Sequence, residues 1–121
     1  MLSYMLSYRN MNMSNELVDK YTYRVIWSED DGVHIARCLE FPSLGAHGET
    51  PETALAEIKA AVSTSIAWMQ ETGETLPVPL GIIRYKGNIT LRIPPSVHRD
   101  LVIRSAEEGV SLNQYILSLI V

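Results

Sequence analysis

Hydrophobic and polar residues alternate at the start of the patterned part of the chain. The apolar positions fall at every second residue: Tyr21, Tyr23, Val25 and Trp27. A period of two that is rich in aromatic and β-branched residues predicts a strand. Asp31-Gly32 favours a tight hairpin turn, so a second strand over 33–41 is expected to return antiparallel. Pro42 is predicted to stop it, and 43–48 to form a short third strand.

A helical period follows the strands. Thr50, Pro51 and Glu52 supply a cap, a fixed φ and a negative charge at the positive end of the helix dipole. The apolar stripe consists of Leu55, Ile58, Val62, Ile66 and Met69. Spacings of three and four predict one buried helix face against the sheet. Gly73 is predicted to end the helix, and 76–79 to form an extended connector.

A second unit follows in the order strand, helix, helix. Residues 88–93 alternate as a strand, and Ser96 is predicted to cap a helix that Gly109 ends. Ser111 with Gln114 forms a capping-box pattern for the last helix. Residues 88–121 lie near the lower size limit for independent folding, about 40 residues, so the unit is expected to need a second copy.

The predicted organisation is an α+β chain of four segments: a loose N-terminal arm at 1–20, a β-β-β-α domain at 21–80, a linker or short strand at 81–86, and a dimerising unit at 87–121. Net charge divides at the same place. The whole chain carries −4. Residues 1–80 hold −6 and residues 81–121 hold +2. This asymmetry indicates different partners for the two ends.

The cellular compartment follows from what the sequence lacks. Cys38 is the only cysteine, residues 1–10 lack the pattern of a secretory signal, and no apolar run reaches membrane-spanning length. We expect a cytoplasmic protein that needs no cofactor.

The second unit offers a candidate DNA-binding surface. If its strand pairs with the same strand of another copy, Ile89, Leu91 and Ile93 turn inward. The outward side chains are then Asn88, Thr90 and Arg92. A two-stranded ribbon fits the major groove, where these side chains pair with base edges. The amides after Ser111, at Leu112 and Asn113, would hold a phosphate at a helix N-terminus. The alternative for the strand residues is the solvated side of an edge strand.

Two kinds of site in the first unit are weaker hypotheses. Asp30, Asp31, Glu40 and Glu52 are carboxylates that a magnesium-dependent nuclease would use. Turn chemistry and the helix dipole explain most of them without catalysis. His34, Cys38 and His47 suggest a zinc site but lack a fourth ligand. We therefore expect a protein that is not an enzyme and has no metal site.

Several motifs of the chain resemble those of a known family. In the C-terminal part these are ITLRIP at 89–94, His98-Arg99, and EEGVSLNQY at 107–115. In the N-terminal part they are the acidic Gly turn between two strands and the TPETA helix start at 50–54. The C-terminal motifs are similar to the ribbon-helix-helix domain, and the N-terminal ones to the partner-binding domain, of the HicB-type antitoxins of type II toxin-antitoxin systems. The resemblance covers about residues 21–120.

This resemblance implies a reduced ribonuclease-H-like first domain without nuclease chemistry. That domain would neutralise a small basic HicA-type toxin that cleaves mRNA. The ribbon-helix-helix domain, as a homodimer or tetramer, would repress its own operon by binding operator DNA. We name four candidates for toxin contact: Trp27, Asp30, Asp31 and Glu40. The alternative function is a stand-alone transcriptional regulator whose first domain senses a ligand or oligomerises.

Overall fold

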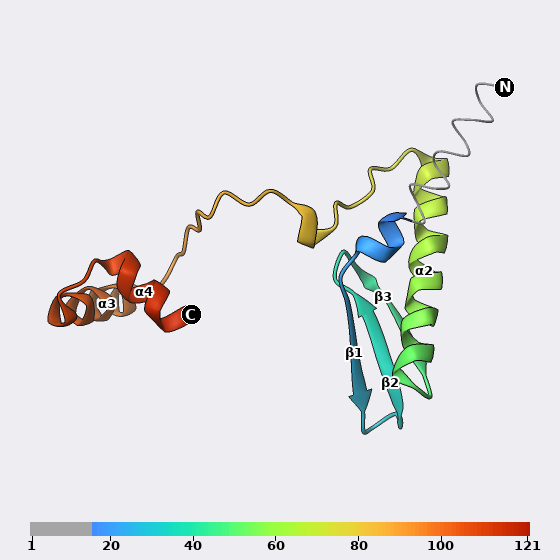
Figure 1. Cartoon of the computed structure of the whole chain (residues 1–121), viewed down its shortest axis with the longest axis horizontal. Coiled ribbons are helices and arrows are strands. Elements are labelled where there is room, and N and C mark those ends of the chain that lie inside the picture. Colours follow the sequence, from blue (N-terminus) through green and yellow to red (C-terminus); the bar gives the residue numbers. More distant parts are fainter. Residues whose placement is uncertain (1–15) are drawn as a thin grey trace. The chain divides into compact units, whose positions relative to one another are not determined.

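The computed structural model describes residues 16–121 and divides the chain into two units, Met1–Arg84 and Tyr85–Val121 (Figure 1). The division falls inside the segment 81–86 that was expected to link two domains. The first fifteen residues of the expected N-terminal arm lie outside the described residues. Among residues 16–121, no helix has the length and hydrophobicity of a membrane span.

The first unit contains a three-stranded antiparallel sheet in the order β1-β2-β3. Its strands are β1 (Tyr23–Ser28), β2 (Val33–Cys38) and β3 (Phe41–Gly48). The predicted α+β class and the hairpin turn before Val33 are confirmed, with Ser28 opposite Val33 and Gly32 at a φ of 65°.

The second and third strands differ from the prediction in their limits. The second strand ends at Cys38, which pairs directly with Phe41, and β3 continues through Pro42. The prediction that Pro42 ends the second strand is therefore wrong. β3 lies at the edge of the sheet, and one side of an edge strand has no neighbouring strand. Proline, which has no backbone N–H, is tolerated there because no hydrogen bond between strands is lost on that side.

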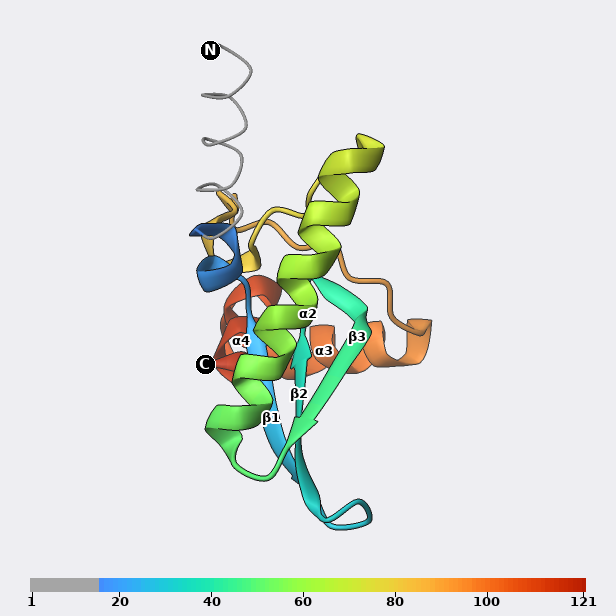
Figure 2. The same ribbon diagram turned by 90° about the vertical axis from the view of Figure 1, so that its right-hand side faces the viewer.

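Helix α2 (Pro51–Thr72) covers one face of the sheet and is seen in front of it in Figure 2. As predicted, the Thr50 hydroxyl accepts the Thr53 N–H at 3.1 Å, and Gly73 ends the helix at a φ of 75°, a conformation that favours glycine. The buried stripe consists of Ala54, Ile58, Val62 and Ile66. It meets Ala36, Cys38 and Phe41 of the sheet to form the core.

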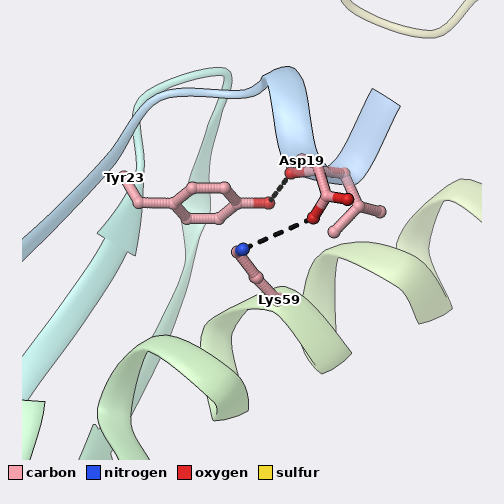
Figure 3. Close-up of polar contacts among 4 residues, drawn as sticks. Asp19, Tyr23 and Lys59 are labelled. Atoms are coloured by element: carbon pink, nitrogen blue, oxygen red, sulfur yellow. Dashed lines mark hydrogen bonds and ion pairs between the residues drawn. The ribbon is translucent and has the colours of Figure 1, made fainter. Parts of the chain in front are cut away.

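Residues 16–20 are helical, although the sequence analysis places them in a loose arm. Val18 is 6% exposed and belongs to the core, and its carbonyl accepts the Tyr23 hydroxyl at 2.7 Å (Figure 3). Asp19 forms an ion pair with Lys59 of α2 at 3.4 Å. The Asp19–Lys59 ion pair joins residues 40 apart in sequence, so local periodicity carries no sign of it.

The second unit contains two helices, α3 (Pro95–Glu108) and α4 (Leu112–Ile120). The prediction that Ser96 caps α3 is wrong. Pro94 occupies the N-cap position without a side-chain hydrogen bond, and Pro95 is the first helical residue. The predicted end at Gly109, with a φ of 71°, is confirmed.

Residues 88–93, predicted as a strand, have no regular secondary structure in the single chain. A strand is defined by hydrogen bonds to a neighbour, and no described residue pairs with this segment. Ile89 is 89% exposed and Leu91 is 65% exposed. The strand prediction therefore depends on a second chain.

Candidate nucleic-acid interface and protein-binding surfaces

The three predicted base-contacting residues lie in the irregular segment before α3. Asn88, Thr90 and Arg92 are all exposed. They alternate with Ile89 and Leu91, which are also exposed. Water satisfies the polar side chains of this segment but not its apolar ones, because burial of apolar surface lowers the free energy.

The helices of the second unit bury little apolar surface between them. Tyr115 of α4 and Ser105 of α3 are its only buried residues, and the Ser105 hydroxyl donates to the Val102 carbonyl at 2.9 Å. Large apolar side chains remain exposed throughout the unit: Ile89, Leu91, Val97, Val102, Ile103, Val110, Leu117, Leu119, Ile120 and Val121. An exposed apolar set of this extent is typical of a surface that another chain covers.

The start of α4 has the predicted capping box. The Ser111 hydroxyl accepts the Gln114 N–H at 3.1 Å, and the Gln114 side-chain oxygen accepts the Ser111 N–H at 3.1 Å. These two bonds leave the amides of Leu112 and Asn113 as first-turn donors, with no acidic residue in that turn. The geometry is compatible with the predicted phosphate contact.

Asp30 and Asp31 lie in the exposed turn between β1 and β2. Asp31 Oδ2 accepts the Ser28 hydroxyl at 3.0 Å, and Ser28 Oγ lies 3.3 Å from the Asp31 amide that donates to it. The Gly32 N–H donates to the Ser28 carbonyl at 2.8 Å. Asp31 thus has a structural role in the turn, whatever else it contacts.

Glu40 connects three parts of the first unit. Its carboxylate accepts the Thr22 N–H at 2.9 Å, the Thr22 hydroxyl at 3.0 Å and the Leu80 N–H at 2.9 Å. The Tyr21 hydroxyl donates to the Pro77 carbonyl at 2.8 Å, and Pro79 is fully buried. Glu40 and Tyr21 therefore hold the connector after α2 against the sheet.

The electrostatics of Glu40 follow from these contacts. Burial raises the pKa of its carboxyl group, but hydrogen bonds from the backbone N–H groups of Leu80 and Thr22 outweigh burial, so the pKa lies below its ordinary value. Burial also raises the pKa of the neighbouring Cys38 thiol, whose sulfur lies 3.5 Å from Glu40 Oε1. These shifts are explained by packing around a structural carboxylate.

The residues considered for a metal site do not come together. Among residues 16–121, no group of three His, Cys, Asp or Glu side chains is placed to hold a metal ion. His34 and Cys38 share the strand face that contains the buried Ala36, whereas His47 pairs with Ile35 on the opposite face. The four carboxylates considered for a nuclease are separated between the hairpin turn, the Glu40 network and the first turn of α2.

Both tryptophans lie largely outside the core. Trp27, one of the candidates for toxin contact, is 51% exposed. Its Nε1 donates to Glu29 at 2.6 Å, and its ring meets His34 edge-on at 5.0 Å. Trp68 is 65% exposed on α2. Tyr21, by contrast, is buried against Phe41.

A surface that the sequence analysis did not single out is the sheet face opposite α2, which we call the open face. Cross-strand pairing places Arg24 beside Arg37 and Ile26 beside Ile35 on it. A depression of about 550 Å³ lies over part of it, lined by Asp31, Val33, Ile35, Arg37, Gly45, Ala46 and His47. In the sequence, this face is indicated by the alternation of Arg24 and Ile26 with Tyr23 and Val25, which pack against the core.

Comparison with known proteins gives one finding. The model of the HicB family matches residues 72–120, from the end of α2 to the end of α4. No curated protein and no solved structure matches the chain. The C-terminal part of the chain is therefore similar to the HicB family, while the resemblance over 21–71 stays a prediction.

Proposed function

We propose that this protein is an antitoxin of the HicB type. Its first unit, a reduced ribonuclease-H-like domain, binds and neutralises a small basic toxin that cleaves mRNA. Its second unit dimerises as a ribbon-helix-helix domain and represses its own operon. The observation that carries the proposal is the second unit itself, which matches the HicB family model and leaves an alternating segment and many apolar side chains of both helices exposed.

Dimerisation of the second unit would bury the apolar side chains of 88–93 and leave the polar ones exposed. Pairing this segment with the same segment of another copy supplies the missing ladder hydrogen bonds and turns Ile89 and Leu91 toward the helices. Asn88, Thr90 and Arg92 then face outward, as an antiparallel ribbon in the major groove requires. The amides of Leu112 and Asn113 contribute phosphate contacts beside the ribbon.

Replacing Arg92 with Ala tests the DNA-binding part of the proposal. Loss of a bidentate contact to a base should weaken operator binding by about 1–3 kcal/mol while binding to scrambled DNA changes much less. Arg104→Ala removes the same charge from the exposed surface of α3 and should change both affinities by the same factor. Fluorescence anisotropy at fixed salt measures both. Equal losses on both DNAs for Arg92→Ala would contradict base contact by this residue.

Charge supports the toxin-binding part. Residues 1–80 carry a net charge of −6 against −4 for the whole chain, which suits a partner that is basic because it binds RNA. Trp27, exposed beside Glu29, and the carboxylates of Asp30 and Asp31 provide apolar and acidic contacts near one turn. Glu40 supports this unit through its hydrogen bonds.

Coexpression with the product of the adjacent gene tests toxin binding. A small basic protein that co-purifies with this chain, and whose RNA cleavage stops on complex formation, would support the proposal. Arg92→Ala should retain full neutralisation, because it alters only the DNA-binding unit. Operator binding without capture of the neighbouring protein would favour the stand-alone regulator instead.

A further inference from the structure

Two arginines meet on the open face of the sheet without acidic partners. Arg24 and Arg37 are direct cross-strand neighbours, and both side chains are exposed. Neither forms an ion pair with a residue in the described part of the chain. Like charges directly opposite on a sheet destabilise it. A bound anion would relieve this repulsion, so the pair indicates an anionic ligand.

The open face is hollowed beside these arginines. The depression of about 550 Å³ lies over β2 and β3 and extends from Arg37 and Gly45 to Asp31. A smaller one of about 200 Å³ lies over β1 and β2 and includes Arg24. Ile35 and Arg37 line both, so an anion at the arginine end can contact both guanidinium groups. The larger volume falls within the range of small-molecule sites, about 300–1,000 Å³.

The arginine end suits a phosphate group. Gly45 pairs with Arg37, and a Cβ atom on Gly45 would lie 3.5 Å from Arg37 Nη1, so the guanidinium group lies beside the glycine. A guanidinium group is a planar fork of N–H donors that matches two oxygens of one phosphate or carboxylate. Two such forks favour a phosphate monoester, which carries about −1.5 to −2 at pH 7, over a carboxylate with a single charge.

The rest of the larger depression is apolar and then acidic. Val33 and Ile35 provide half-buried apolar surface, and His47, opposite Ile35, contributes an imidazole ring. Nucleobases stack on rings of this kind. At the far end, the Ser28 hydroxyl donates to Asp31 Oδ2 at 3.0 Å and so orients the carboxylate. An oriented carboxylate accepts N–H groups and repels a second phosphate.

We propose that the open face binds a nucleoside monophosphate whose base carries N–H donors. Its phosphate contacts Arg24 and Arg37, its base covers Ile35 beside His47, and Asp31 accepts the N–H groups of the base edge. Four residues of β2 span about 13 Å, which is comparable to one extended mononucleotide. Guanosine monophosphate is the best probe, because its base edge offers two neighbouring N–H groups to one carboxylate.

Charge and shape disfavour the nearest alternatives. Inorganic phosphate would fill the arginine end but leave the apolar part of the depression in water. A longer RNA would bring further phosphates toward Asp31, and residues 1–80 carry a net charge of −6 that opposes a polyanion. The inference does not depend on the proposed antitoxin function, although Asp31 is also a candidate for toxin contact.

Isothermal titration calorimetry of the full-length chain with guanosine monophosphate tests the site. Arg37→Ala and Arg24→Ala should each weaken binding by at least about tenfold, because each removes hydrogen bonds to a charged group. Arg84→Ala, which alters an exposed arginine outside the sheet, is the matched control and should leave the affinity unchanged. Asp31→Asn should weaken binding of guanosine monophosphate but not of inorganic phosphate, because only the base reaches this residue.

Thermal denaturation separates loss of the site from loss of the fold. Without ligand, Arg37→Ala should melt close to the wild type, because it removes one of two repelling charges. Guanosine monophosphate should raise the melting temperature of the wild type but not of this variant.

Three outcomes would overturn the inference. One is a wild-type affinity in folded Arg37→Ala and Arg24→Ala. Another is inorganic phosphate binding as tightly as guanosine monophosphate, which should bind at least about tenfold more tightly because its base buries apolar surface. The third is an affinity that rises with the length of a single-stranded RNA, which would assign the face to an RNA backbone.

Discussion

Glu40 shows how far a single residue's role depends on its surroundings. As a carboxylate near the end of a predicted strand, it was compatible with a nuclease site or a toxin contact. In the structure its oxygens accept hydrogen bonds from Thr22 and Leu80, which lie on either side of it in sequence and far from each other. A hydrogen bond to a charged group contributes about 1.5–3 kcal/mol, so this residue matters first for stability.

Replacing Glu40 with Gln should lower the free energy of unfolding of the first unit by roughly 1–3 kcal/mol at neutral pH. The amide keeps the shape but loses the charge that strengthens the bonds from Thr22 and Leu80. Urea denaturation followed by tryptophan fluorescence measures the change. Glu57→Gln, on the exposed side of α2, is the matched control and should have little effect. A wild-type midpoint for Glu40→Gln would show that the network contributes nothing measurable.

The same carboxylate predicts a dependence of stability on pH. The pKa of Glu40 in the folded protein lies below its ordinary value of 4.5. Its stabilising contribution is therefore complete above that value and is lost as the pH falls through the folded-state pKa. Stability measured from pH 6 to pH 3 should fall less in Glu40→Gln than in the wild type, and parallel curves would contradict this.

At the scale of elements, helix ends follow local rules and strand packing does not. Thr50, Gly73, Gly109 and Ser111 cap the helices where the sequence places them, because a cap involves residues within one turn. Ser96 fails as a cap because Pro94 and Pro95 start α3 two residues earlier. The limits of β2 and β3 depend on the Cys38–Phe41 pairing, which no local pattern indicates.

Gly48 marks the closest approach of β3 to α2. A Cβ atom there would lie 2.5 Å from the Ala54 nitrogen, a backbone contact that no rotamer change relieves. Gly48→Ala should destabilise the first unit by about 1–3 kcal/mol or more. Gly45→Ala, in the same strand, places its Cβ at an ordinary 3.5 Å and should change stability by only about 0.5 kcal/mol. Thermal denaturation compares them, and equal losses would contradict the close contact.

At the scale of the whole molecule, the two units differ in how complete they are. The first has a core of strands and α2 with several fully buried side chains, whereas the second buries only Ser105 and Tyr115. Units of fewer than about 40 residues usually need a disulfide, a metal or another copy to be stable, and for this unit we propose another copy.

The folding of the second unit should therefore depend on protein concentration. Dilution from about 100 μM to 1 μM should lower the melting temperature of α3 and α4, because dissociation precedes unfolding. Far-UV circular dichroism at both concentrations, compared with the Leu91→Asp variant, measures this. The Leu91→Asp variant should have a lower melting temperature for α3 and α4, and that temperature should no longer depend on protein concentration. A wild-type melting temperature that is independent of concentration would contradict dimerisation through 88–121.

The sequence alone determined the order of β1, β2, β3 and α2, the α+β class, most helix ends and the charge division, because each depends on residues within a few positions of one another. The alternation in 88–93 predicts a strand that the single chain does not form, so that strand stays a prediction. Only the tertiary structure decided that residues 16–20 belong to the first unit, that Glu40 joins the connector to the sheet, and that Arg24 and Arg37 meet. Those outcomes depend on contacts between segments distant in sequence, which local periodicity does not encode.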